Sequence, residues 1–310
     1  MKKNTATLLI IVFAIVLLWG CRADTIDEGN GGQPPDTAGD SGVEPITQVQ
    51  PDPQSLTVPG NHDNGGMTIN REELIREFAD NSFKKQQVRY QNVRKAVEEK
   101  YPVIKELFAD KGMEYPPHAI FIRAFKKERT VELWAQPDSG QPFVLVTEYE
   151  ICRLSGELGP KRQEGDRQVP EGFYHINVFN PSSSFLLSLG INYPNQSDCI
   201  LGVQGNLGGE IFIHGGCATI GCIPITDDKI MELYLIAVET KSKGQDRIPV
   251  HIFPCRMDDE GMEFLKEEFG EDSDMTGFWN NLKEGYDYFE QNQALPVVNV
   301  DDRGRYVFPD

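Results

Sequence analysis

Hydrophobic residues recur every three or four positions in the stretch that begins at Arg71, a spacing typical of an amphipathic helix. We expect Ser82 to cap the main helix of this stretch, Gly112 to end it, and Pro102 to kink or divide it. Residues 71–118 are therefore predicted to be an N-terminal helical segment. The positions that form its apolar face are Tyr90, Val93, Val97, Tyr101, Ile104 and Phe108.

Short apolar runs separated by turn residues replace this pattern after residue 118, which favours β-strands. The predicted strands cover 119–125, 130–135, 143–151, 172–179, 210–214 and, further on, 249–253.

Helical spacing returns in three places within the second half of the chain. One predicted helix starts near Thr226, which is a suitable N-cap, with Asp227 and Asp228 at its positive end. Two further amphipathic helices are expected at 258–269 and 276–291. The order of elements predicts one α+β domain of about 240 residues, with two subdomains as the alternative.

The first twenty residues have the pattern of an export signal. Lys2 and Lys3 precede residues 8–18, which are 11 consecutive apolar positions, and then comes Trp19-Gly20-Cys21. An apolar run of this length is a secretory signal core and is short for a membrane span. The ending resembles a bacterial lipobox, so residues 1–20 are predicted to be a lipoprotein signal peptide and Cys21 the lipidation site. An uncleaved signal anchor is the alternative.

Composition separates residues 21–70 from the rest of the chain. Positions 22–70 hold 8 Gly, 6 Pro and 8 acidic residues but no Phe, Tyr or Trp. Such a segment cannot bury enough apolar surface to offset its conformational entropy, so we predict a disordered tether. The whole chain carries a formal net charge of −18, which argues against a nucleic-acid partner.

The segment from Ile211 to Cys222 carries the most informative chemistry. An apolar strand leads to His214, a glycine-rich turn follows, and Cys222 comes shortly before a predicted helix. A thiolate nucleophile needs a nearby imidazole, and glycines let backbone N–H groups approach a developing oxyanion. The backbone N–H of Cys222, next to Gly221, is a suitable donor. The pattern therefore favours a Cys–His nucleophilic site.

Two other interpretations of these cysteines, a disulfide and a metal site, remain open on spacing alone. In an exported protein Cys217 and Cys222 can form a disulfide, or either can pair with one of the remaining thiols. Once Cys21 is lipidated, five cysteines are left, so at least one thiol must stay unpaired within the chain. A metal site at His214, Cys217 and Cys222 lacks an evident fourth ligand. The remaining candidates for pairing are Cys152, Cys199 and Cys255.

Residues 211–226 resemble the catalytic motif of the YkuD-type L,D-transpeptidase family. His214-Gly215 match the first half of that motif, and Thr219-Ile220-Gly221-Cys222 match the second half. An upstream strand entry, Pro170-Glu171-Gly172-Phe173-Tyr174, agrees with the family. Further stretches are similar to the YafK-like subgroup, and the likeness covers most of 119–307. They are Arg153-Leu154-Ser155-Gly156, Leu158-Gly159-Pro160-Lys161-Arg162, Tyr193-Pro194-Asn195, Val250-His251-Ile252-Phe253-Pro254 and the segment 281–289.

The resemblance implies cysteine acyl transfer on the stem peptides of peptidoglycan, without metal or cofactor. Cys222 is then the nucleophile that forms a thioester, and His214 is the general base and later the acid. The backbone carbonyl of Gly215 orients the imidazole, and N–H groups at Gly221 and Cys222 form the oxyanion hole. An amine acceptor gives transpeptidation, whereas water gives an L,D-carboxypeptidase or an amidase that releases wall-linked protein.

The sequence departs from the family motif at three points. Ile220 stands where the family has its second histidine, Thr219 replaces serine, and no arginine follows Cys222. Because that arginine suits a substrate carboxylate, recognition must differ here, and a non-catalytic wall-binding lipoprotein is a third hypothesis. Thr219 and three basic residues are the weaker candidates for substrate contact. These basic residues are Arg153, Lys161 and Arg162.

These inferences predict a β-rich YkuD-type catalytic domain with N-terminal and C-terminal helices. The catalytic core is expected at 119–245, and 246–310 is expected to be a C-terminal extension of the same domain. The protein is expected outside the cytoplasm, in the periplasm or on the cell surface, held to a membrane through Cys21. His175, His251 and Asp166 are interpreted as scaffold residues.

Overall fold

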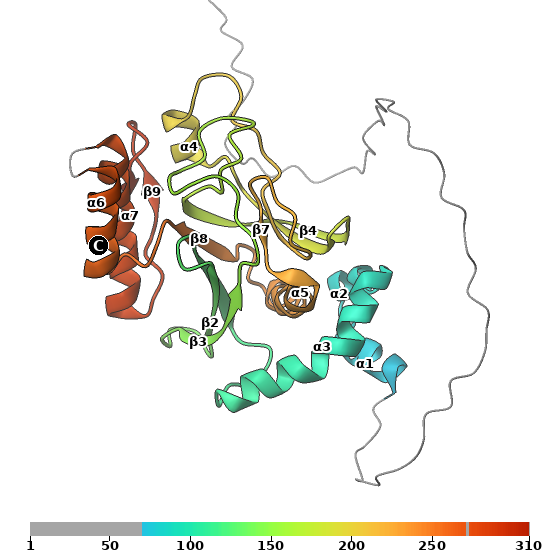
Figure 1. Cartoon of the computed structure of the whole chain (residues 1–310). Coiled ribbons are helices and arrows are strands. Elements are labelled where there is room, and N and C mark those ends of the chain that lie inside the picture. The colour runs from blue at the N-terminus through green and yellow to red at the C-terminus, as the bar shows by residue number, and fades with distance from the viewer. Residues whose placement is uncertain (1–69, 271–272, 310) are drawn as a thin grey trace, which may run out of the picture. The chain divides into compact units, whose positions relative to one another are not determined.

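The computed structural model describes residues 70–270 and 273–309 (Figure 1). The predicted signal peptide, Cys21 and the tether up to residue 69 lie outside this part of the chain. In the described residues, helices flank an eight-stranded mixed sheet, which confirms the α+β class. No helix among these residues is both long enough and apolar enough to cross a bilayer.

Three helices form the N-terminal segment, and they are α1 (Arg71–Phe78), α2 (Ser82–Gln87) and α3 (Gln91–Asp110). The side chain of Asn81, rather than the predicted Ser82, caps α2 by accepting a hydrogen bond from the Lys84 N–H. The expectation that Pro102 divides the helix is wrong, because α3 continues through it. Burial of the apolar face of α3 against α5 (Thr226–Ser242) offsets the hydrogen bond that proline cannot make.

The sheet has the strand order β3-β2-β1-β8-β4-β5-β6-β7. The sequence predicted six of its strands but missed β5, in which Gly190 interrupts the strand pattern, and β7, which has only two residues. The strands are β1 (Ala119–Phe125), β2 (Thr130–Gln136), β3 (Val144–Glu150), β4 (Gly172–Ser183), β5 (Leu186–Ile191), β6 (Phe212–His214), β7 (Ile223–Pro224) and β8 (Pro249–Phe253).

Both faces of the central strands are buried, and alternate residues point to opposite faces. In β1, Ile120 and Ile122 join the core that includes α3 and α5. Phe125, on the other face, packs with residues of α6 (Asp259–Phe269) and α7 (Asp274–Asn292). Figure 1 shows α6 and α7 together on one side, with α3 and α5 on the other.

Three short elements complete the fold beside α7. Helix α4 (Gln196–Leu201) begins with a capping box at Asn195, and β9 (Asn299–Val300) pairs with β10 (Tyr306–Val307). The Ser197 hydroxyl donates to the Gly304 carbonyl at 2.6 Å, which fixes the β9–β10 turn on α4.

The outermost strands of the sheet, β3 and β7, meet because the sheet is curled. The N–H of Cys152, just after β3, donates to the carbonyl of Pro224 in β7 at 3.1 Å. A disulfide between Cys152 and Cys217 reinforces the same junction. The segment that carries Cys222 therefore has neighbours from both ends of the sheet.

Candidate active site

His214 is the last residue of β6, where its side chain is buried. Its Nδ1 lies 2.6 Å from the carbonyl oxygen of Gly215. A carbonyl can only accept a hydrogen bond, so the neutral imidazole carries its proton on Nδ1 and leaves the Nε2 lone pair available. The Gly215 carbonyl thus fixes the tautomer that a general base requires.

Cys222 immediately precedes β7, which runs parallel to β6 with Ile213 opposite Ile223. Extending this register by one residue sets Cys222 opposite Phe212, two positions before His214. Because side chains alternate along a strand, Cys222 and His214 lie on the same face of the sheet. The Phe212 N–H lies 3.4 Å from the Cys222 sulfur, which agrees with this register. The thiol of Cys222 is not in a disulfide.

Burial keeps both members of the pair neutral. Burial raises the pKa of the Cys222 thiol, although the Phe212 N–H partly opposes this effect. Burial also lowers the pKa of His214, and the hydrogen bond to Gly215 opposes it only in part. The resting site therefore has a neutral thiol and a neutral imidazole on one face of the sheet, and a neutral imidazole is the form that can accept a proton from an attacking thiol.

The turn before Cys222 is braced internally by Thr219. The Thr219 hydroxyl donates to the Cys222 carbonyl at 2.8 Å and accepts from the Gly221 N–H at 3.2 Å. The Gly221 N–H is thus already used within the turn, whereas the sequence had assigned it to the oxyanion hole. Gly221 has φ +137°, and a Cβ there would approach the Gln168 carbonyl to 3.2 Å. Glycine is needed at this position for both reasons.

Two side-chain contacts around the His214–Gly216 segment were not recognised from the sequence. The Phe185 ring, at the tip of the β4–β5 hairpin, stacks on the imidazole with 4.4 Å between ring centroids. The Asp227 carboxylate accepts the Gly216 N–H at 2.8 Å. Asp227 was expected only at a helix terminus, and Phe185 had no sequence signal because β5 was missed. A Cβ on Gly215 would collide with Asp227 and with the Phe185 carbonyl, so both contacts require glycine.

The start of α5 also differs from the sequence prediction. Ile225 occupies the N-cap position, and no side chain caps the helix. Thr226 has φ +72°, and its N–H donates to the Gly216 carbonyl. Residues 226 and 227 therefore fasten the loop after His214 to the helix, in place of the expected Thr226 cap.

The disulfide decides among the hypotheses for the cysteines that their spacing left open. Cys217 is bonded to Cys152, with 5.7 Å between their Cα atoms. Cys217 is therefore unavailable both for a bond to Cys222 and as a metal ligand beside His214. Among the residues that the structure describes, Cys222 and Cys255 keep free thiols, and Cys222 is the more accessible because Cys255 is buried.

The basic candidates for substrate contact occupy three different environments. Arg153 is exposed and follows Cys152, so its backbone adjoins the 215–221 loop. Lys161 is buried, and its ammonium donates to Asp166 and to the Gln163 carbonyl. That position suits a structural cation and keeps Lys161 off the surface. Arg162 is half-buried and pairs with Asp198 at 3.2 Å, next to a cavity described below.

Asp166 organises the loop between β3 and β4. It accepts hydrogen bonds from the backbone N–H groups of Arg162, Gln163 and Gln168, as well as from Lys161. Burial would raise the pKa of Asp166, but these bonds outweigh it and hold the pKa below its usual value. Asp166 thus shapes the loop that adjoins Gly221.

His251 lies in β8 with the aromatic rings of Phe121 and Phe173 packed against it, at 4.5 and 4.7 Å between centroids. Burial, and to a smaller extent Arg123, lowers the pKa of His251 to about 3. The imidazole is therefore neutral within the core, as a scaffold residue would be.

Comparison with known proteins identifies relatives of this chain. A protein of Escherichia coli (strain K12) named "Putative L,D-transpeptidase YafK" is 38% identical over 190 residues, which is 61% of this chain and 73% of the relative. Its counterpart in Escherichia coli O157:H7 gives the same values. No protein-family model matches the chain.

Solved structures give more distant likenesses. The helical cell shape determining protein Pgp2 from Campylobacter jejuni is 16% identical with a TM-score of 0.36, covering 59% of this chain and 73% of Pgp2. Bdellovibrio bacteriovorus Bd1075 is 22% identical with a TM-score of 0.32, covering 44% of this chain and 48% of its own. At these scores the structural likenesses add nothing to the sequence relationship.

Proposed function

Since this chain belongs to the YafK-like group of the L,D-transpeptidase family, we propose that it is a cysteine acyltransferase acting on peptidoglycan stem peptides. One observation carries the proposal. An unpaired Cys222 thiol lies on the same sheet face as His214, whose Nδ1 is held by the Gly215 carbonyl.

The reaction begins at the sulfur of Cys222. As the sulfur attacks the amide carbonyl next to a diaminopimelate residue, Nε2 of His214 takes the thiol proton. The backbone N–H of Cys222 donates to the carbonyl oxygen as it becomes negative. The C–N bond then breaks, His214 returns the proton to the leaving amine, and a thioester remains on Cys222.

The acceptor determines the product. An amine that attacks the thioester loses a proton to His214, forms a new amide and releases the thiol. Water attacking in the same way gives a free carboxylate, which is the L,D-carboxypeptidase or amidase outcome. Arg153, exposed beside the 215–221 loop, is the candidate cation for a substrate carboxylate.

The disulfide supports a location outside the cytoplasm. Structural disulfides persist in oxidising compartments and are rare in the cytosol. We place the protein in the periplasm or on the cell surface, anchored through a lipid on Cys21. Radiolabelled palmitate incorporation tests this: wild-type protein takes up label, Cys21→Ala does not, and equal labelling of the two would refute the anchor.

Acylation by a carbapenem tests the nucleophile directly, with intact-protein mass spectrometry as the readout. We expect one covalent adduct on the wild type and on Cys255→Ala, which removes the buried thiol, but none on Cys222→Ala. Incubation with purified muropeptides then separates the products, because transpeptidation gives cross-linked dimers and hydrolysis gives trimmed stems. A Cys222→Ala protein that retains full turnover would overturn the proposal, and a wild type inert in both assays would favour the non-catalytic wall-binding alternative.

A further inference from the structure

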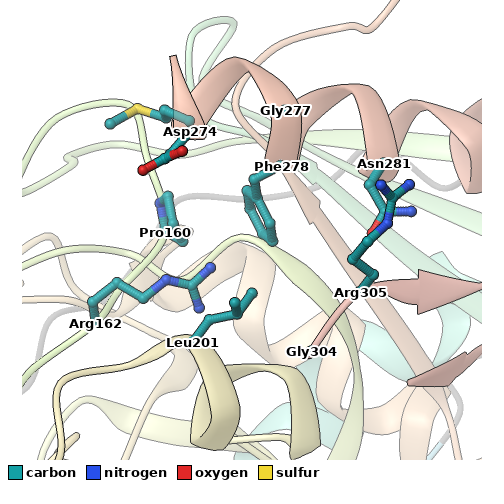
Figure 2. A pocket seen from close by; sticks show the side chains of 10 residues that line it. Pro160, Arg162, Leu201, Asp274, Gly277, Phe278, Asn281, Gly304 and Arg305 are labelled. Atoms are coloured by element: carbon teal, nitrogen blue, oxygen red, sulfur yellow. The ribbon is translucent and has the colours of Figure 1, made fainter. Parts of the chain in front are cut away.

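A cavity of about 490 Å³ lies apart from the Cys–His pair, where α7 approaches the loop between β3 and β4 (Figure 2). Arg162 from that loop, Leu201 at the end of α4 and Gly304 from the β9–β10 turn line it together with the first turns of α7. We propose that this cavity is a second binding subsite for a peptidoglycan stem peptide. The proposal rests on the function proposed above.

The walls of the cavity are held by hydrogen bonds, so it exists before any ligand binds. The Trp279 indole N–H donates to the buried Glu171 carboxylate at 2.7 Å, which fixes α7 against the sheet. The Asn281 side chain exchanges two hydrogen bonds with the backbone of Tyr306, at 2.8 and 2.9 Å. A preformed pocket loses little ordering entropy on binding.

Two guanidinium groups offer donors to this cavity. An arginine has five N–H donors, and within residues 70–270 and 273–309 Arg162 uses one of them, on Asp198 at 3.2 Å. Arg305 contacts Glu284 at 3.5 Å, the outer limit of a hydrogen bond, and is well exposed. Guanidinium groups bind carboxylates in a bidentate manner, so the class of ligand includes a free carboxylate.

Other lining groups define the remaining chemistry of the ligand. The Phe278 ring lies under the Arg162 guanidinium at 4.9 Å, and Leu201 and Met275 add apolar surface. The exposed Asp274 carboxylate faces the cavity from α7 (Figure 2). A ligand that matches these groups carries a carboxylate, an aliphatic stretch and an ammonium group. A stem peptide containing diaminopimelate has all three.

The cavity shares a structural element with the proposed active site. The loop between β3 and β4 supplies Arg162 to the cavity, and its Gln168 carbonyl adjoins Gly221 next to Cys222. Asp166 braces both ends of this stretch through backbone hydrogen bonds. A stem peptide bound in the cavity is thereby held on the same loop that borders the nucleophile.

Gly277 allows the cavity to be filled without disturbing its walls. It is an exposed residue of α7, and a Cβ built on it meets no atom within 4 Å. Gly277→Trp therefore projects an indole into open space. Asn280→Trp places the same ring on an exposed position of the same helix, which does not line the cavity, and is the matched control.

Calorimetric titration of Cys222→Ala protein with a synthetic stem tetrapeptide ending in diaminopimelate–D-alanine tests the subsite. We expect Gly277→Trp in this background to weaken binding at least tenfold or to remove one binding site, and Asn280→Trp to change neither. Arg305→Gln, an exposed substitution, is expected to weaken binding similarly if the tryptophan variant does not fold. Unchanged titrations for folded Gly277→Trp and for Arg305→Gln would overturn the proposal.

Kinetics on otherwise wild-type protein separate this proposal from the proposed function. Gly277→Trp is expected to raise KM for muropeptides at least tenfold while carbapenem acylation at Cys222 stays within twofold. Failure of carbapenem acylation and muropeptide turnover in the wild type would refute the enzyme but leave the titration as a test of the cavity. Normal acylation with an unchanged KM in Gly277→Trp would refute the cavity alone.

Discussion

Cys152 and Cys217 are joined by a disulfide that ties the end of β3, an outermost strand of the sheet, to the loop between His214 and Cys222. The bond spans 65 positions of sequence. It therefore restricts the unfolded chain strongly, and it also holds the loop that connects His214 to Cys222.

Replacing this disulfide by Cys152→Ala and Cys217→Ala is expected to lower the free energy of unfolding by roughly 2–5 kcal/mol. Urea denaturation measures this change, and Cys255→Ala is the control for removal of a buried sulfur. Carbapenem acylation is expected to slow on the order of 10–100-fold, because the nucleophile and base are no longer held together. Unchanged stability and acylation would show that the backbone contacts of the loop suffice.

In a plot of acylation rate against pH, the fall in rate at low pH (the acid limb) reports on the protonation of His214. Burial lowers the pKa of this histidine, so protonation removes the base only at a pH below the ordinary histidine value. We expect the acylation rate to fall on acidification through that lower pKa, and to rise towards alkaline pH as the thiol ionises. His214→Gln is expected to lose roughly 10²–10⁴-fold in rate together with the acid limb. A profile that His214→Gln does not alter would assign the limb to another group.

Phe185 is a positioning residue for His214, because its ring stacks on the imidazole. The residue is 38% exposed, so a substitution there does not empty the core. Phe185→Ala is expected to slow acylation by roughly 2–10-fold, the value of one aromatic pair. Phe185→Tyr should restore the rate because it keeps the ring. NMR titration of His214 provides the second readout, since loss of the ring exposes the imidazole and moves its pKa back towards the ordinary value. A purely structural role would leave that pKa unchanged.

Asp198 makes the stability of the fold dependent on pH. Burial raises the pKa of this carboxyl to about 6, although the Asn195 N–H and Arg162 oppose the shift. The folded state thus binds the proton more tightly than the unfolded chain. The stabilisation is present below the unfolded pKa of about 3.8 and is lost as pH rises through about 6.

The shift in the pKa of Asp198 corresponds to roughly 2–3 kcal/mol of folding free energy. Urea denaturation at pH 4, 5, 6 and 7 measures it as the difference between the wild type and Asp198→Asn. We expect the free energy of unfolding of Asp198→Asn to increase relative to that of the wild type as the pH rises through this series. Parallel pH dependences would show that Asp198 titrates normally.

Local patterns in the sequence were sufficient for most elements of the fold. The prediction for β1 agreed at both ends, as did that for β8, because a short apolar run bounded by turn residues defines a buried strand locally. Pro102 was misjudged because local propensity does not include the packing of α3 on α5. β5 was missed because Gly190 breaks the pattern, although pairing with β4 and β6 stabilises the strand.

The residue types of the candidate site were also evident in the sequence, since His214, the glycines and Cys222 lie within nine positions of one another. Only the tertiary structure decided that Cys217 is bonded to Cys152 while Cys222 keeps its thiol, because disulfide pairing depends on distances between segments that are remote in sequence. The stacking of Phe185 on His214 and the cavity beside Arg162 were decided in the same way. Both bring together residues from different elements, and that juxtaposition exists only once the sheet has curled and α7 has packed against it.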